Sequence, residues 1–281
     1  MDMKMVDVQN KIVEIVKYFD DFCNEHNITY YLMGGSALGA VRHSGFIPWD
    51  DDFDVFMTYN NYIKFLDVCE EHLDTDKFFL QKENTKEWPL FFSKIRMNNT
   101  TYIEDYSLNR EMHKGFFIDI MCLNNTVDNK VLRYIQYVSA RLITTKTLAE
   151  RGYITNSKVK KISMLLSRIL IKGVIFDGLL KNVRRYNSSE TSLVGHFFGR
   201  AGFKNTSFPK DYLGAPLYME FSGLNLPVPQ EVDKYLKVRY GGDYMKIPQS
   251  NIRDQYPVHA IYVDTEQDYK GFKNEVHKLR R

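Results

Sequence analysis

Apolar residues recur at helical spacing near the start of the chain. Between residues 5 and 26 they lie three or four positions apart, at Val8, Ile12, Ile15, Val16, Phe19 and Phe22. This spacing places them on one face of a helix, so the sequence predicts an amphipathic helix that ends near Asn27. Residues 29–33 are rich in aromatic side chains and lead into two glycines, a pattern typical of a strand.

Later segments continue this alternation of helices and strands. Ser36 is predicted to be the N-cap of a short helix that runs to about Arg42, and a loop follows it. Two helical regions are predicted, over 60–73 and over most of 130–187. Further strands are predicted over 52–57, 78–80, 91–96, 101–103 and 115–121.

This order of elements predicts an α+β fold with a mixed sheet flanked by helices, a helical insert and a C-terminal extension. We expect a core over residues 1–125 and a basic, mainly helical insert over 126–207. The remaining residues, 208–281, are expected to pack on the core as a C-terminal segment.

Composition narrows the classes of function. The chain has 281 residues, of which 44% are hydrophobic and 14% aromatic, enough for a sizeable core. A net charge of +3 gives no reason to expect nucleic-acid binding. Three widely spaced cysteines, without a CxxC pair, indicate reduced thiols in a cytoplasmic protein. Neither a signal peptide nor a membrane-spanning run is expected.

Four carboxylates crowd into five positions of the sequence WDDDFDV, beside apolar residues. Side chains alternate between the faces of a strand, so Asp52 and Asp54 would share one face while Phe53, Val55 and Met57 face the core. Two carboxylates so placed can bind Mg²⁺, which completes its shell with water and phosphate oxygens.

A third carboxylate, Asp119, lies alone in the apolar run FFIDIM at 116–121. An unpaired buried carboxylate is costly. A neighbouring strand that carries Asp52 and Asp54, together with a metal ion, would compensate it. We therefore expect the two predicted strands to lie side by side.

Groups suited to phosphate lie in the same part of the chain. Gly35 and Ser36 follow a predicted strand and begin a helix, so backbone N–H groups and the helix dipole would favour an anion. Arg42 lies near the end of that helix, and Lys94 and Arg96 alternate on another predicted strand. A reaction that needs both a metal ion and phosphate-binding groups is the transfer of a group at a phosphate, so these residues together indicate that kind of reaction.

Each of these features also has an ordinary structural interpretation. The glycines commonly form a turn, the paired aspartates commonly cap or solvate a strand end, and Asp119 could pair with a nearby Lys or Arg. Their combination, in this order and spacing, favours a functional site.

The stretch GGSALGAVRHSGFIPWDDDFDV resembles the signature of the LicD family, which belongs to the nucleotidyltransferase-fold superfamily and includes phosphorylcholine transferases and fukutin-related proteins. GFFIDIM and YLKVRYGGDYMKIP are similar to later segments of that family. The resemblance covers about 10–125 and 208–250. It implies a nucleotidyltransferase-like core and transfer of a phospho-alcohol, with phosphocholine the best candidate, from a CDP-linked donor to a sugar hydroxyl of a cell-surface glycan or its lipid-linked precursor. CMP would be released.

By position in that motif, Asp52, Asp54 and Asp119 would be catalytic and would bind Mg²⁺, with Mn²⁺ as the alternative ion. Gly35 and Ser36 would bind the diphosphate, and Arg42, Lys94 and Arg96 are weaker candidates for substrate binding. Asp50 and Asp51 belong to the motif without an assigned role.

Two rival functions share these residues. One is a nucleotidyltransferase that uses a nucleoside triphosphate, and the other is a non-catalytic, membrane-associated protein that binds a cation structurally. Residues 158–185 hold eight Lys or Arg and one Asp, a net charge of +7. Such a basic amphipathic segment suits peripheral contact with an anionic membrane at the inner face of the plasma membrane, or an insert packed on the core with solvated basic residues.

Overall fold

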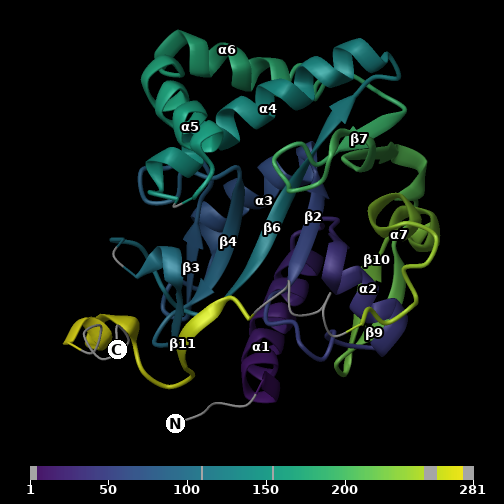
Figure 1. Cartoon of the computed structure of the whole chain (residues 1–281). Helices are drawn as coiled ribbons and strands as arrows, with labels where there is room; N and C mark the ends of the chain where they lie inside the picture. Colours follow the sequence, from purple (N-terminus) through teal and green to yellow (C-terminus); the bar gives the residue numbers. More distant parts are fainter. Residues whose placement is uncertain (1–4, 109, 154, 250–257, 275–281) are drawn as a thin grey trace.

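The protein folds around one mixed sheet with helices on both sides (Figure 1). In this computed structural model residues 5–108, 110–153, 155–249 and 258–274 are described. Strands follow the order β1-β2-β6-β4-β3, and β7 and β8 extend the sheet from β6. The helices are α1 (Met5–Glu25), α2 (Gly34–His43), α3 (Tyr59–His72), α4 (Lys130–Glu150), α5 (Lys158–Leu170), α6 (Gly173–Val183) and α7 (Val232–Tyr240).

Within the described ranges, the strands fall in three sheets. The large sheet contains β1 (Tyr31–Leu32), β2 (Asp54–Thr58), β3 (Phe78–Gln81), β4 (Phe92–Met97), β6 (Phe117–Thr126), β7 (Leu193–Gly195) and β8 (Ser207–Pro209). Two antiparallel pairs accompany it: β9 (Leu217–Phe221) with β10 (Leu224–Val228), and β5 (Thr101–Glu104) with β11 (Ala260–Asp264). The predicted α+β class is confirmed.

The main core lies between α1 and the large sheet. All six apolar positions predicted for the first helix are buried, and so are Phe53, Val55 and Met57 beside the acidic stretch. Burial of this apolar surface is the dominant favourable term in folding. The prediction that Phe53, Val55 and Met57 face the core is therefore confirmed.

Helices α4, α5 and α6 form a separate layer, at the top of Figure 1. A small apolar cluster joins α4 and α6 to the segment before β4, through Phe91, Ala140, Ile143, Val183 and Phe197. These helices lie in the segment predicted to be a helical insert, 126–207, although that segment also supplies β7 to the large sheet. Among the described residues, none of the helices combines the length and apolarity that crossing a bilayer requires.

Three details differ from the sequence-based expectation. The first strand is only Tyr31–Leu32, and β2 begins at Asp54, so Asp52 precedes the strand. Ser36 is not the N-cap, because α2 begins at Gly34 and the residue before it has an extended backbone. Gly34 takes a φ of +52°, which favours glycine, and this allows β1 to turn directly into α2.

Candidate active site

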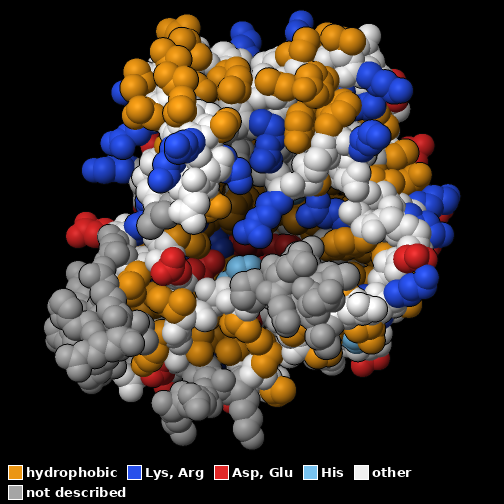
Figure 2. Space-filling view, viewed as in Figure 1, with side chains coloured by type: hydrophobic (Ala, Val, Ile, Leu, Met, Phe, Trp, Pro, Cys, Tyr) orange, Lys and Arg blue, Asp and Glu red, His pale blue; other side chains and the backbone are white. Residues whose placement is uncertain are grey.

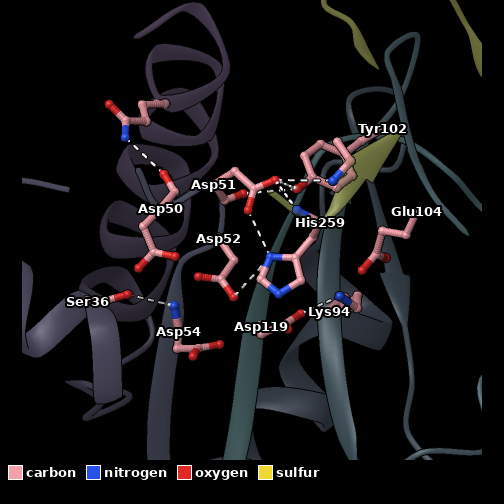
Figure 3. A network of polar contacts seen from close by, with 12 residues as sticks. Ser36, Asp50, Asp51, Asp52, Asp54, Lys94, Tyr102, Glu104, Asp119 and His259 are labelled. Carbon is pink, nitrogen blue, oxygen red and sulfur yellow. Dashed lines mark hydrogen bonds and ion pairs between the residues drawn. The ribbon is translucent and has the colours of Figure 1, made fainter. Parts of the chain in front are cut away.

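Strand pairing brings Asp54 and Asp119 side by side. Strand β2 runs parallel to β6, with Asp54 paired with Asp119 in the register. Neighbouring strands lie about 4.8 Å apart, so the two carboxylates project from adjacent positions of the sheet. Asp52 lies two residues before Asp54 and points toward the same space (Figure 3). The structure therefore assembles the three carboxylates that the sequence predicted as one site.

Asp50 is a fourth carboxylate in this group, which we call the acidic cluster (Asp50, Asp52, Asp54 and Asp119). Burial, and then the charge of Asp52, raise the pKa of Asp50 to about 8. Burial and the neighbouring carboxylates also raise the pKa of Asp54 well above its usual value. The pKa of Asp119 rises to about 6, because burial outweighs the opposing effect of Lys94. Four carboxylates at close range repel one another, and protons or a cation must offset that repulsion.

This donor set fits a hard divalent cation, since all of its ligands would be carboxylate oxygens. Within the described residues, no group of three or more acidic, histidine or cysteine side chains is placed so that it could hold a metal ion. Asp52, Asp54 and Asp119 would therefore have to adjust their side chains to share an ion. The metal assignment stays a prediction that the chemistry of the cluster supports.

Lys94 provides a fixed positive charge beside the cluster. Strand β4 pairs antiparallel with β6, which places Lys94 opposite Asp119, and its Nζ lies 2.6 Å from Asp119 Oδ1. The Lys94 side chain is 2% exposed, and its ammonium lies 3.2 Å from the centre of the Phe117 ring. Burial lowers the pKa of Lys94, opposed by Asp119. Lys94 thus compensates the charge of Asp119 directly. This contact matches the alternative expected from the sequence, in which Asp119 pairs with a nearby Lys or Arg.

The start of α2 lies against the acidic cluster. The Ser36 hydroxyl accepts a hydrogen bond of 2.8 Å from the Asp54 backbone N–H, so this side chain joins α2 to the first residue of β2. A Cβ atom on Gly35 would lie 2.8 Å from Asp50 Oδ2. A glycine at position 35 therefore allows the Asp50 carboxyl to approach the helix N-terminus, where the dipole favours negative charge.

Arg42 and Arg96 are not brought into the cluster. The Arg42 guanidinium donates to the carbonyl oxygens of Tyr244 and Lys246, so it fixes the turn after α7. Arg96 is buried and donates to Gln81 Oε1 and the Gly115 carbonyl, both at 2.8 Å. These contacts indicate structural roles for both arginines.

A further group that the sequence did not predict surrounds Asp51 (Figure 3). His259 Nδ1 lies 2.8 Å from Asp51 Oδ1, and the Tyr102 hydroxyl donates to Asp51 Oδ2 at 2.6 Å. Burial raises the pKa of Asp51, but hydrogen bonds from His259 and Tyr102 outweigh it, and the net shift is downward. The hydrogen bond with Asp51 raises the pKa of His259 to about 9.

His259 also faces the acidic cluster. Its Nδ1 lies 3.9 Å from Asp52 Oδ2, so Asp51 holds a cationic imidazole beside one of the predicted metal ligands. His259 is 208 residues from Asp51 in the sequence and reaches it because β11 pairs with β5. No motif around His259 could have indicated this contact.

The acidic cluster lies near a hollow in the front face of the molecule. Figure 2 shows acidic side chains and a histidine at the floor of this hollow, with Lys and Arg side chains above them. The helical layer forms the upper border of the hollow. A negative floor under a positive border suits a ligand that carries both metal-binding oxygens and negative charge.

Comparisons with known proteins agree with this geometry. The LicD/FKTN/FKRP nucleotidyltransferase domain matches residues 27–121. Over 262 residues, which cover 89% of this chain and 95% of the relative, the chain is 26% identical to the lipopolysaccharide cholinephosphotransferase LicD of Haemophilus influenzae. Over 58 residues, 21% of this chain and 11% of the relative, it is 36% identical to the human ribitol 5-phosphate transferase FKRP. The matched domain, residues 27–121, includes all four aspartates of the acidic cluster, so this part of the chain is similar to the nucleotidyltransferase domain of the LicD family.

Proposed function

We propose that the protein transfers a phospho-alcohol, with phosphocholine as the first candidate, from a CDP-linked donor to a sugar hydroxyl of a cell-surface glycan or its lipid-linked precursor. The observation that carries this proposal is the pairing of Asp54 with Asp119, beside Asp52 and the start of α2. The similarity to a lipopolysaccharide cholinephosphotransferase over most of the chain supports the choice of phosphocholine.

The proposed reaction exchanges one phosphorus–oxygen bond for another. The acceptor hydroxyl oxygen forms a bond to the phosphorus that carries the alcohol. The bond from that phosphorus to the bridging oxygen breaks, and CMP leaves with the bonding electrons. A cation held by Asp52, Asp54 and Asp119 would neutralise the negative charge that builds up on the leaving phosphate.

The chain's own residues would manage the proton and the position of the donor. Asp119 is the candidate acceptor for the hydroxyl proton, because its carboxylate lies beside Asp54 in the acidic cluster, where the acceptor hydroxyl would approach. Lys94 holds this carboxylate in place at 2.6 Å. The Gly35 backbone lies at the start of α2, where the diphosphate would bind once Asp50 is protonated or shares the cation.

A donor panel tests the proposal. Purified protein is incubated with CDP-choline, CDP-ethanolamine, CDP-ribitol, CDP-glycerol or CTP, with a glycolipid extract as acceptor and with either MgCl₂ or EDTA. We expect CMP release from one CDP-linked donor, greatest with CDP-choline, and only with the metal. Asp67→Asn, an exposed carboxylate on α3, is the matched control and should retain full activity.

The rival functions give different results in the same assay. Release of pyrophosphate from CTP, without CMP release from any CDP-linked donor, would identify a nucleotidyltransferase. Metal-dependent thermal stabilisation without turnover of any donor would favour a structural cation site. Equal CMP release with EDTA and with MgCl₂ would exclude the proposed metal dependence.

A further inference from the structure

Helix α5 turns its apolar face away from the protein. Its buried positions are Ser167 and, just after its end, Ile171. Apolar residues recur every three or four positions on the opposite side of the helix. Their side chains are 49–77% exposed: Val159, Ile162, Leu165, Leu166, Ile169 and Leu170. If α5 packed on the rest of the protein through this stripe, these side chains would be buried. Packing within the chain therefore does not explain why the stripe is apolar.

The exposed apolar surface continues onto the neighbouring helix. Val174 and Ile175, at the start of α6, are 88% and 56% exposed. We call these two residues and the α5 stripe together the outer apolar face. Figure 2 shows apolar side chains gathered over the helices at the top of the molecule, with Lys and Arg around them. A continuous exposed apolar patch of this kind marks an interaction surface.

Basic residues frame the outer apolar face. Residues 158–183 contain six exposed Lys or Arg against one acid, Asp177, which leaves a net charge of +5. Lys158, Lys160 and Lys161 lie in the first turn of α5, where the helix dipole disfavours positive charge. Their position costs helix stability and is explained if the surface meets a negatively charged partner.

We propose that the outer apolar face docks on the surface of a lipid bilayer that contains anionic headgroups. An interfacial helix buries its apolar side chains at the boundary between headgroups and acyl chains, while flanking Lys and Arg contact the headgroups. A second copy of the chain fits less well, because two surfaces of net charge +5 would repel each other. The docking is independent of the proposed transferase reaction, since none of its residues belongs to the acidic cluster.

Docking in this orientation has a consequence for the catalytic hollow. The helical layer borders that hollow (Figure 2), so a bilayer held against α5 and α6 would lie on the same end of the molecule as the basic border. An acceptor carried on a lipid would then be presented to the site at a high local concentration. This arrangement suits the lipid-linked acceptor of the proposed function.

Vesicle flotation tests the docking. The full chain is mixed with phosphatidylcholine vesicles that contain phosphatidylglycerol, or with phosphatidylcholine alone. We expect at least tenfold stronger binding to the anionic vesicles, which falls as salt rises. Leu165→Glu/Ile169→Glu should reduce that binding at least tenfold. The control Leu217→Glu/Tyr218→Glu alters residues of similar exposure, 47% and 49%, on β9 and should leave binding unchanged.

A second pair of variants separates charge from apolar burial. Lys160→Gln/Lys161→Gln should weaken binding by roughly fivefold for each lysine. The control Lys86→Gln/Lys204→Gln removes two exposed lysines outside the helical layer and should have little effect. Absence of binding to anionic vesicles, or equal loss in both lysine pairs, would overturn the proposal. So would a dimer in sedimentation velocity that Leu165→Glu/Ile169→Glu abolishes, because the face would then bind a second copy.

Discussion

Two amphipathic helices, α1 and α5, use their apolar faces in opposite ways. The apolar positions of α1 are almost completely buried against the large sheet, with Ile15 and Val16 at 0% exposure. Those of α5 have the same three- and four-residue spacing, yet Ile169 remains 57% exposed. The spacing of apolar residues therefore identifies a face of a helix, and the surroundings decide whether that face meets the core or something outside the chain.

The same contrast separates the two functional regions. In the acidic cluster, Asp54 and Asp119 lie on the paired strands β2 and β6, and their geometry comes from strand register and buried partners such as Lys94. The outer apolar face is on helices that contact the rest of the protein through their other sides. Changes in the first region should affect chemistry and folding, whereas changes in the second should affect association only.

Asp54→Ala is expected to have the largest effect. Loss of a charge-stabilising group that acts in the transition state costs several kcal/mol, so donor turnover should fall about a thousandfold or more. Vesicle binding should stay unchanged, because Asp54 lies outside the outer apolar face. Stability without metal should be equal or higher, since removal of one carboxylate relieves repulsion within the cluster.

Turnover of CDP-linked donors, vesicle flotation and thermal unfolding measure these three properties on one preparation. Leu165→Glu/Ile169→Glu is the converse variant, which should lose vesicle binding and retain turnover of a soluble donor. If Asp54→Ala kept near-normal turnover, Asp54 would not belong to the reaction centre. If it lost vesicle binding, the two regions would not be independent.

Truncation of Ile15 tests the buried side of the comparison. Ile15→Ala removes three carbon atoms from a position at 0% exposure and should lower the free energy of unfolding by about 2–5 kcal/mol. Urea unfolding followed by circular dichroism gives this value. A loss below about 1 kcal/mol would mean that α1 is not firmly packed on the sheet.

The features that the sequence predicts correctly are those that depend on a local pattern of residues. The spacing of apolar residues located α1, and the period of a strand placed Phe53 and Val55 in the core. The pairing of β2 with β6 was predicted because a buried Asp119 needs a compensating neighbour. That argument needs only the chemistry of a buried carboxylate, although the two paired residues, Asp54 and Asp119, are 65 positions apart.

Other features could not be predicted because they depend on contacts without a local signal. The Asp51–His259 contact joins residues 208 positions apart. The direction of the α5 stripe depends on what packs against the helix. Ser36 looked like an N-cap because serine commonly caps helices, but Gly34 starts α2 earlier and leaves the hydroxyl to bind the Asp54 N–H.

The stability of the metal-free protein should fall as pH rises from about 6 to about 9. His259 has a pKa of about 9 in the folded protein and about 6.5 when unfolded. Its ion pair with Asp51 therefore stabilises fully below about pH 6.5 and is lost as pH rises through 9. Asp50, with a pKa of about 8, also binds its proton more tightly when folded, so its ionisation acts in the same direction.

Thermal unfolding in EDTA at several pH values measures this fall, and we expect a decrease of several degrees over that range. Asp50→Asn should reduce the slope, since it removes one of the two groups that titrate. Millimolar MgCl₂ should raise the melting temperature more at the higher pH, because the ion binds ionised carboxylates. A melting temperature that is constant or rises with pH in EDTA would contradict the cluster's electrostatics.

Ile169→Ala is expected to have the smallest effect on the isolated protein. It makes the same chemical change as Ile15→Ala on a helix of the same period, but on a side chain that stays 57% exposed. The free energy of unfolding should therefore change by no more than about 0.5 kcal/mol. A loss comparable to that of Ile15→Ala in urea unfolding would show that the α5 stripe is packed within the protein in solution. A negligible loss, together with weaker binding to anionic vesicles, would show that the stripe stabilises an assembly with a membrane and not the fold of the chain itself.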